Sequence, residues 1–160
     1  MMIAETRRTI LKVGTFAAAL AVMPGLALAA KTVKRFTNGK RGNFAIGGYD
    51  PTAYFARGEA VKGAEDHKVS WEGSEWLFET AESAEKFKAA PDDFAPQFGG
   101  YCTFAMSIGK IVASNPEIWR IRDGKLYLFA GAGGGKKFDK GPDAMIEKAQ
   151  SFWDTLTLVE

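Results

Sequence analysis

Two stretches of the chain show the apolar and polar pattern of β-hairpins. Residues His67 to Phe78 alternate around the turn signal Glu72-Gly73-Ser74, which predicts one hairpin. Apolar runs at Ile118 to Ile121 and Leu126 to Phe129 flank Asp123-Gly124, a dipeptide that favours a type I′ turn. The second pattern predicts another hairpin.

Helical spacing and capping residues predict the other elements. Asp50-Pro51 is typical of a helix start, so a short helix is expected through Phe55. A helix is predicted from Thr80 to about Ala89, with a further helical turn at Pro91 and a last amphipathic helix from Asp143 to Leu156. Two hairpins with helices predict an α+β fold in which a small antiparallel sheet, built from the two hairpins, packs against helices.

The distribution of apolar residues predicts one domain. From Phe44 onward they recur without a long linker or an internal repeat, so residues 44–160 are expected to form a single unit. Residues 30–43 are basic with few apolar positions, which predicts a flexible lead-in. The run Gly131 to Lys137 departs from the phosphate-loop pattern and is expected to be a flexible connection between the second hairpin and the last helix.

The first residues have the pattern of an export signal. Arg7 and Arg8 precede an alanine-rich apolar stretch, as in twin-arginine signals, and small residues predict cleavage between Ala29 and Ala30. The predicted signal peptide is residues 1–29, its partner is the twin-arginine translocase, and the destination is the bacterial periplasm. Alanine and glycine contribute little transfer free energy, so a stable membrane anchor is not expected.

Composition and charge exclude some classes of function. The 160 residues carry a net charge of +2 with 46% hydrophobic residues, as in a soluble globular domain. Removing residues 1–29 leaves equal numbers of basic and acidic side chains, so nucleic-acid binding is not expected. One cysteine cannot form an internal disulfide. No Gly-x-Ser-x-Gly elbow presents a serine, so hydrolase chemistry is not expected either.

Cys102 is the strongest candidate for chemistry. Met106 lies four positions further on and shares a face with Cys102 in either a strand or a helix. Together with His67, the only histidine, the two sulfur atoms would form a soft site suited to copper or zinc. Burial of Cys102 without ligation and thiol redox chemistry are the alternatives.

Tyrosine side chains could line a ligand pocket, because their rings combine apolar area with a polar tip. The candidates are Tyr49, Tyr54 and Tyr101. The alternative is that these rings belong to the core.

Several motifs occur together along residues 44–156. They are Gly48-Tyr49-Asp50-Pro51-Thr52-Ala53-Tyr54-Phe55, His67, Trp76-Leu77-Phe78 and the segment from Phe94 to Cys102. As a set they resemble the secreted branch of the YHS-domain family. Cysteine-rich relatives in that family look like soft-metal binders, which implies metal binding through the residues that carry over, His67 and Cys102. Met106 is added to this set on geometry alone.

The sequence thus predicts an exported, non-catalytic binding module whose pocket lies around His67 and Cys102, with a soft metal such as copper as the ligand. A periplasmic protein-interaction domain without a cofactor is the alternative. A thiol-dependent enzyme acting through Cys102 is the third hypothesis.

Overall fold

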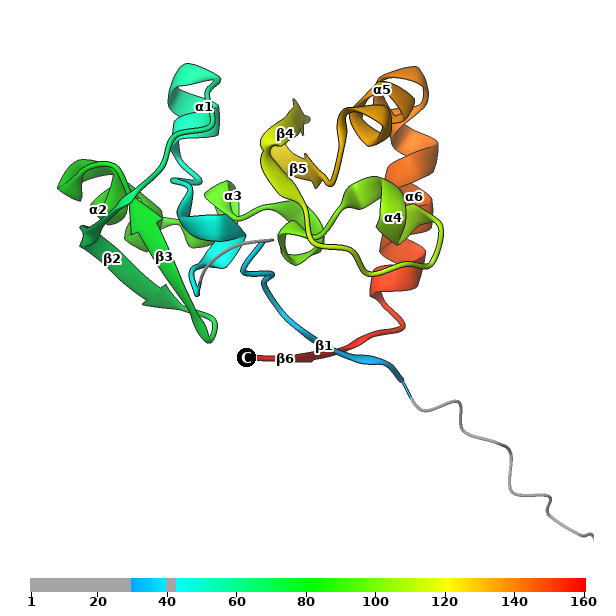
Figure 1. Cartoon of the computed structure of the whole chain (residues 1–160), viewed down its shortest axis with the longest axis horizontal. Helices are drawn as coiled ribbons and strands as arrows, with labels where there is room; N and C mark the ends of the chain where they lie inside the picture. The colour runs from blue at the N-terminus through cyan, green and yellow to red at the C-terminus, as the bar shows by residue number, and fades with distance from the viewer. Residues whose placement is uncertain (1–29, 40–42) are drawn as a thin grey trace, which may run out of the picture.

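The computed structural model describes residues 30–39 and 43–160 (Figure 1). The predicted export signal, with Arg7, Arg8 and the cleavage position after Ala29, lies outside these residues. In chain order the elements are β1 (Thr32–Lys34), the 3-10 turn η1 (Ala45–Gly48), α1 (Ala53–Arg57), β2 (Ala64–Trp71), β3 (Ser74–Phe78), α2 (Ala81–Ala89), α3 (Pro91–Phe94), the 3-10 turn η2 (Gln97–Gly100), α4 (Thr103–Ser107), β4 (Asn115–Arg122), β5 (Lys125–Phe129), α5 (Ala132–Lys140), α6 (Pro142–Trp153) and β6 (Thr157–Val159).

The predicted α+β class is confirmed. Both predicted hairpins are present, as the antiparallel pairs β2–β3 and β4–β5. The hairpins stay separate in the part of the chain that the structure describes, and each forms its own two-stranded sheet. A third, parallel pair joins β1 to β6 near the two ends of the described chain (Figure 1).

The hairpin turns explain why the strands begin and end where they do. Asp123 and Gly124 have φ of 51° and 69°, the left-handed pair that a type I′ turn needs. Glu72 and Gly73 adopt the same conformation, with φ of 47° and 64°. This conformation matches the right-handed twist of the flanking strands, so the register of both hairpins is fixed at the turn.

The order of elements repeats, which corrects the expectation that the chain has no internal repeat. The first half, residues 45–94, contains a 3-10 turn, a short helix, a hairpin and two helices. The second half, residues 97–153, contains the same series in the same order.

Backbone details match between the halves. An isolated bridge pairs Tyr49 with Lys62 in the first half, and the equivalent bridge pairs Tyr101 with Ala113 in the second. Each of these tyrosines follows two glycines with φ between 59° and 78°. Among side chains, Gly-Gly-Tyr is the clearest shared motif, because most other equivalent positions hold different residues. The repeat is therefore visible in the backbone and weak in the sequence.

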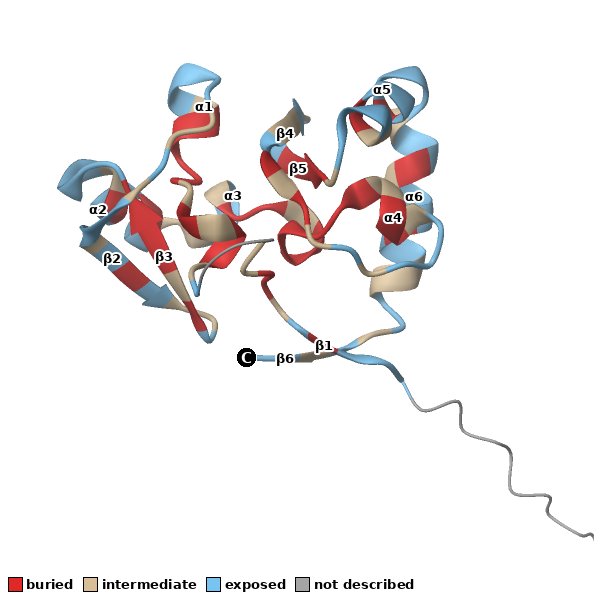
Figure 2. Cartoon of the chain, viewed as in Figure 1, coloured by how far each residue is buried: buried red, intermediate tan, exposed pale blue. Residues whose placement is uncertain are grey.

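The core is divided between the halves, and β5 lies between its two parts (Figure 2). Leu126 and Leu128 of β5 pack into the first-half core, around Trp76 and Phe87. The alternate residues of β5 pack into the second-half core. The alternation of side chains along a strand thus joins the two halves through one central strand.

Residues 30–43 are not a flexible lead-in throughout. Thr32–Lys34 forms β1, and Phe36 is only 5% exposed. The Phe36 ring packs against Trp71 and Trp76, with centroids 5.2 and 5.0 Å away. Phe36 therefore packs against the first half and Val33 joins the second-half core, contacts that composition alone does not indicate.

The glycine-rich run is helical, which corrects the expectation of a flexible connection. It forms α5, whose Phe138 ring packs 5.3 Å from the rings of both Tyr127 and Phe129. A Cβ at Gly134 would lie 3.3 Å from atoms of Phe104 and Phe129, so glycine allows α5 to approach its neighbours closely. Packing outweighs the poor helix propensity of glycine here.

The remaining helix predictions are largely confirmed. Thr80 caps α2 in a reciprocal capping box with Ser83, and Pro91 begins α3. The last helix ends at Trp153, earlier than predicted, because Thr157–Val159 forms β6. Within the described residues, no helix is long and apolar enough to cross a membrane.

Candidate functional site

The structure does not bring the predicted metal ligands together. His67 lies on β2 and is half-buried, whereas Cys102 directly precedes α4 and is buried. Figure 1 places β2 and α4 on opposite sides of the molecule. Met106 lies in the second-half core with Cys102, and its backbone N–H donates to the Cys102 carbonyl oxygen. The predicted set of one imidazole and two sulfur atoms is therefore split.

Cys102 has a structural contact that accounts for its position. Its Sγ accepts a hydrogen bond from the Ala105 backbone N–H at 3.5 Å, so the thiol caps α4. The equivalent residue in the first half is Asp50, whose carboxylate accepts from the backbone N–H of Thr52 and Glu79. Among the described residues, no group of three or more His, Cys, Asp or Glu side chains could hold a metal ion.

The three tyrosines of the predicted pocket also separate. The Tyr101 hydroxyl donates to the carbonyl oxygen of Lys34, the last residue of β1. Burial raises the pKa of this tyrosine. Tyr49 and Tyr54 both contact the start of β4 instead. The pocket expected around Tyr49, Tyr54, His67, Tyr101 and Cys102 is not formed by these residues as one set.

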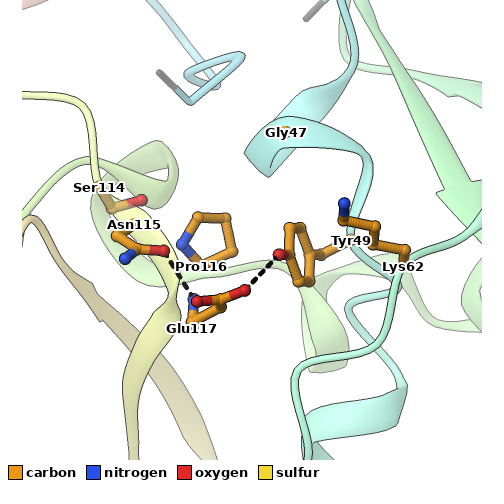
Figure 3. A pocket seen from close by; sticks show the side chains of 7 residues that line it. All are labelled: Gly47, Tyr49, Lys62, Ser114, Asn115, Pro116 and Glu117. Atoms are coloured by element: carbon orange, nitrogen blue, oxygen red, sulfur yellow. Dashed lines mark hydrogen bonds between the residues drawn. The ribbon is translucent and has the colours of Figure 1, made fainter. Parts of the chain in front are cut away.

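A different pocket lies where the two halves meet (Figure 3). Its volume is about 390 Å³, within the range of small-molecule sites. The first half contributes Gly47, Tyr49 and Lys62, and the second half contributes residues 114–117. Tyr49 is the one predicted pocket residue that lines it.

A hydrogen bond between Tyr49 and Glu117 crosses this pocket. The Tyr49 hydroxyl donates to Glu117 Oε1 at 2.9 Å. The Glu117 backbone N–H donates to Asn115 Oδ1 at 3.1 Å, which orders the segment that carries the carboxylate. Burial raises the pKa of Tyr49, and the hydrogen bond and charge of Glu117 raise it further. The hydroxyl is therefore neutral and available as a donor near pH 7.

Tyr54 supports the wall of the pocket from behind. Its hydroxyl donates to the Pro116 carbonyl oxygen at 2.9 Å, and its ring packs edge-on against Trp119 at 5.3 Å. Burial strongly raises the pKa of Tyr54, so the hydroxyl keeps its proton and the contact persists. The peptide that carries residues 114–117 is held in place by this buried bond.

Ser114 is a buried polar residue without a partner. It is 0% exposed, and its Oγ makes no hydrogen bond with any described residue. In Figure 3 the hydroxyl points from the wall into the pocket. The equivalent first-half residue is Gly63, where a Cβ would lie 2.3 Å from the Leu77 carbonyl carbon. The second half therefore has room for a hydroxyl that the first half excludes.

The pocket also holds two opposite charges that are not paired. Lys62 and Glu117 are exposed, and neither forms an ion pair with another described residue. The pocket thus offers an ammonium, a carboxylate, a phenol, an amide and a hydroxyl within one cavity. These groups can bind a small polar molecule by hydrogen bonds and charge.

Of the residues that line this pocket, Tyr49 was expected from the sequence, whereas Lys62, Ser114 and Glu117 were not. Those residues are polar and lie in loops or at a strand end, where polarity is ordinary. The usable signal was the repeated Gly-Gly-Tyr, because aligning its two copies places Ser114 opposite Gly63.

In comparisons with known proteins, no family model, no curated protein and no solved structure matches this chain.

Proposed function

We propose that this chain is an exported, non-catalytic binding module that holds a small polar organic ligand in the pocket between its two halves. Export rests on the twin-arginine pattern around Arg7 and Arg8, which favours the periplasm as the place of action. The resemblance to secreted YHS-domain proteins supports the same destination.

The unpartnered hydroxyl of Ser114 carries the proposal. A buried hydroxyl without a hydrogen bond costs about 1–3 kcal/mol, and a ligand atom placed in the pocket would remove that cost. Tyr54 fixes the adjacent backbone, so the site is formed before the ligand arrives. Preorganisation of this kind lowers the entropic cost of binding.

The lining atoms favour an organic ligand over a soft metal. Copper(I) prefers sulfur and imidazole nitrogen, whereas this pocket presents oxygen atoms and an ammonium group. Cys102 and Met106 lie in the second-half core, away from the pocket lining. Elemental analysis of the purified protein is the check on the metal hypothesis, because a stoichiometric metal lost in Cys102→Ser would restore it.

A library of small polar metabolites, screened by backbone amide NMR shifts of the purified protein, tests the proposal. Binding should shift the amides of residues 114–117 and saturate. Ser114→Ala and Tyr49→Phe should weaken binding several-fold. Their matched controls are Ser151→Ala on the exposed face of α6 and Tyr101→Phe at the equivalent position of the second half, and both should leave binding unchanged. Saturable shifts confined to another surface would overturn the proposal.

A further inference from the structure

We infer that the ligand of this pocket is a zwitterion of the amino-acid class, with its carboxylate on Lys62 and its ammonium on Glu117. This inference rests on the function proposed above and adds the chemical class of the ligand. It follows from the unpaired charges of the pocket and from the placement of its neutral groups.

The Lys62 ammonium and the Glu117 carboxylate are placed to contact a ligand and do not contact each other. Both side chains line one cavity, yet they form no ion pair, so their charged atoms stand more than 4 Å apart. Only one Glu117 oxygen accepts from Tyr49, which leaves the other carboxylate oxygen free for an ammonium group. A molecule with both charges can satisfy both side chains at once, whereas a simple cation or anion satisfies one.

The rest of the pocket suits the remainder of such a molecule. The Tyr49 ring and the Pro116 ring offer apolar surface for a side chain, and Ser114 Oγ offers a hydrogen bond to a polar atom at the end of the ligand remote from Lys62 (Figure 3). In Figure 3, Lys62 and Ser114 lie on opposite sides of the Tyr49–Glu117 pair. The volume of about 390 Å³ leaves room for a single amino acid with a medium side chain.

The equivalent positions hold a carboxylate, Asp66 in place of Glu117, but no ammonium group and no hydroxyl, which assigns the site to one side of the repeat. Ala113 stands where the first half has Lys62, and Gly63 stands where the second half has Ser114. The repeat provides the same backbone twice, but only the junction of Lys62 with residues 114–117 combines an ammonium group, a carboxylate and the buried hydroxyl.

The test titrates the purified full chain with the common L-amino acids and follows the amides of Lys62, Ser114 and Glu117. The tightest binder is then compared with its α-amide, which lacks the carboxylate, and its N-acetyl form, which lacks the ammonium. Each blocked form should bind about two- to fivefold more weakly, the scale of one charge pair at a partly exposed site.

Two variants assign each charge to its partner. Lys62→Gln should weaken binding of the amino acid about two- to fivefold but leave binding of its α-amide unchanged. Glu117→Gln should weaken binding of the amino acid and leave binding of the N-acetyl form unchanged. Lys148→Gln on the exposed surface of α6 is the control and should change neither.

The outcomes separate this inference from the proposed function. If polar metabolites bind at residues 114–117 but amino acids do not, or if blocked and free forms bind equally, the zwitterion inference is overturned and the binding function stands. If no small molecule shifts the pocket amides, both fail.

Discussion

The Tyr49 hydroxyl in the first half lies 2.9 Å from Glu117 Oε1 in the second half and donates its hydrogen to it. The two residues are far apart in sequence, and their contact crosses the pocket between the halves. Glu117→Gln should lower the pKa of Tyr49, because the mutation removes the charge and the ionic acceptor while burial remains. NMR titration of the Tyr49 ring would measure the shift, and an unchanged pKa would contradict the bond.

The buried tyrosines predict loss of stability in alkali. Burial raises the pKa of Tyr54 and Tyr101 above the value of about 10 that applies in the unfolded chain. Below pH 10 the stabilisation is fully present, and it falls as pH rises further because only the unfolded state then loses protons. Urea denaturation between pH 8 and 11 should show this decline. The Tyr54→Phe variant should be less stable at pH 8, but its free energy of unfolding should fall less steeply as pH rises.

Asp50 should contribute strongly to stability. Its carboxylate is buried and accepts from the Thr52 backbone N–H at 2.8 Å, the Thr52 hydroxyl at 2.7 Å and the Glu79 backbone N–H at 3.0 Å. Asp50→Ala should lower the free energy of unfolding by about 3 kcal/mol, since these donors lose a charged acceptor. Asp66→Ala, at an exposed position of β2, is the control and should change the free energy of unfolding by less than about 0.5 kcal/mol. An equal effect of both would contradict the role of Asp50.

Cys102 should react slowly with alkylating reagents in the native protein. The residue is 3% exposed and its Sγ accepts from the Ala105 N–H, so a reagent reaches it only when the chain opens locally. Mass spectrometry after iodoacetamide treatment at pH 7.5 should show far slower labelling than in urea. Fast native labelling would favour the thiol-dependent enzyme again.

The sequence predicted the fold class and both hairpins because their signals are local. Asp123-Gly124 requires left-handed φ, and Thr80 carries its own capping hydroxyl, so neither depends on distant residues. The errors concern tertiary contacts. α5 is helical because Phe138 packs on β5, and nothing local in a glycine run indicates that contact.

The candidate site was harder to predict than the fold. Tyr49 was found because aromatic residues are conspicuous, whereas Ser114 acquires meaning only through its burial and its lack of a partner. His67 and Cys102 were grouped by chemical type, and the fold places them in different halves. The chemistry of single residues gives no information about distances between strands.

Two glycines in α5, Gly133 and Gly134, test whether close packing or helix propensity decides the effect of an alanine. A Cβ at Gly133 would meet no heavy atom within 4 Å, whereas one at Gly134 would meet Phe104 and Phe129 at 3.3 Å. Gly133→Ala should therefore raise the free energy of unfolding by about 0.8 kcal/mol. Gly134→Ala should gain less or destabilise, and chemical denaturation of both variants would show the order. A larger gain at Gly134 would mean that α5 does not approach Phe104 and Phe129 as closely as described.

Because the N-terminal segment packs on η2, alanine should destabilise the protein far more at one glycine than at another of similar backbone conformation. Gly99 and Gly109 have φ of 59° and 72°, so an alanine at either pays the left-handed cost of about 1 kcal/mol. At Gly99 the new Cβ would also lie 1.9 Å from the Arg35 carbonyl oxygen, and at Gly109 it would meet nothing. Gly99→Ala should therefore lower the free energy of unfolding by at least about 2 kcal/mol more than Gly109→Ala does. The reason is that Arg35 must move away, and the Thr37 N–H then loses its hydrogen bond to the Gly99 carbonyl oxygen. Increased hydrogen exchange at the Thr37 amide in Gly99→Ala alone would locate the loss of stability in the N-terminal segment. An equal loss of unfolding free energy in the two variants would show that residues 32–37 do not pack on η2.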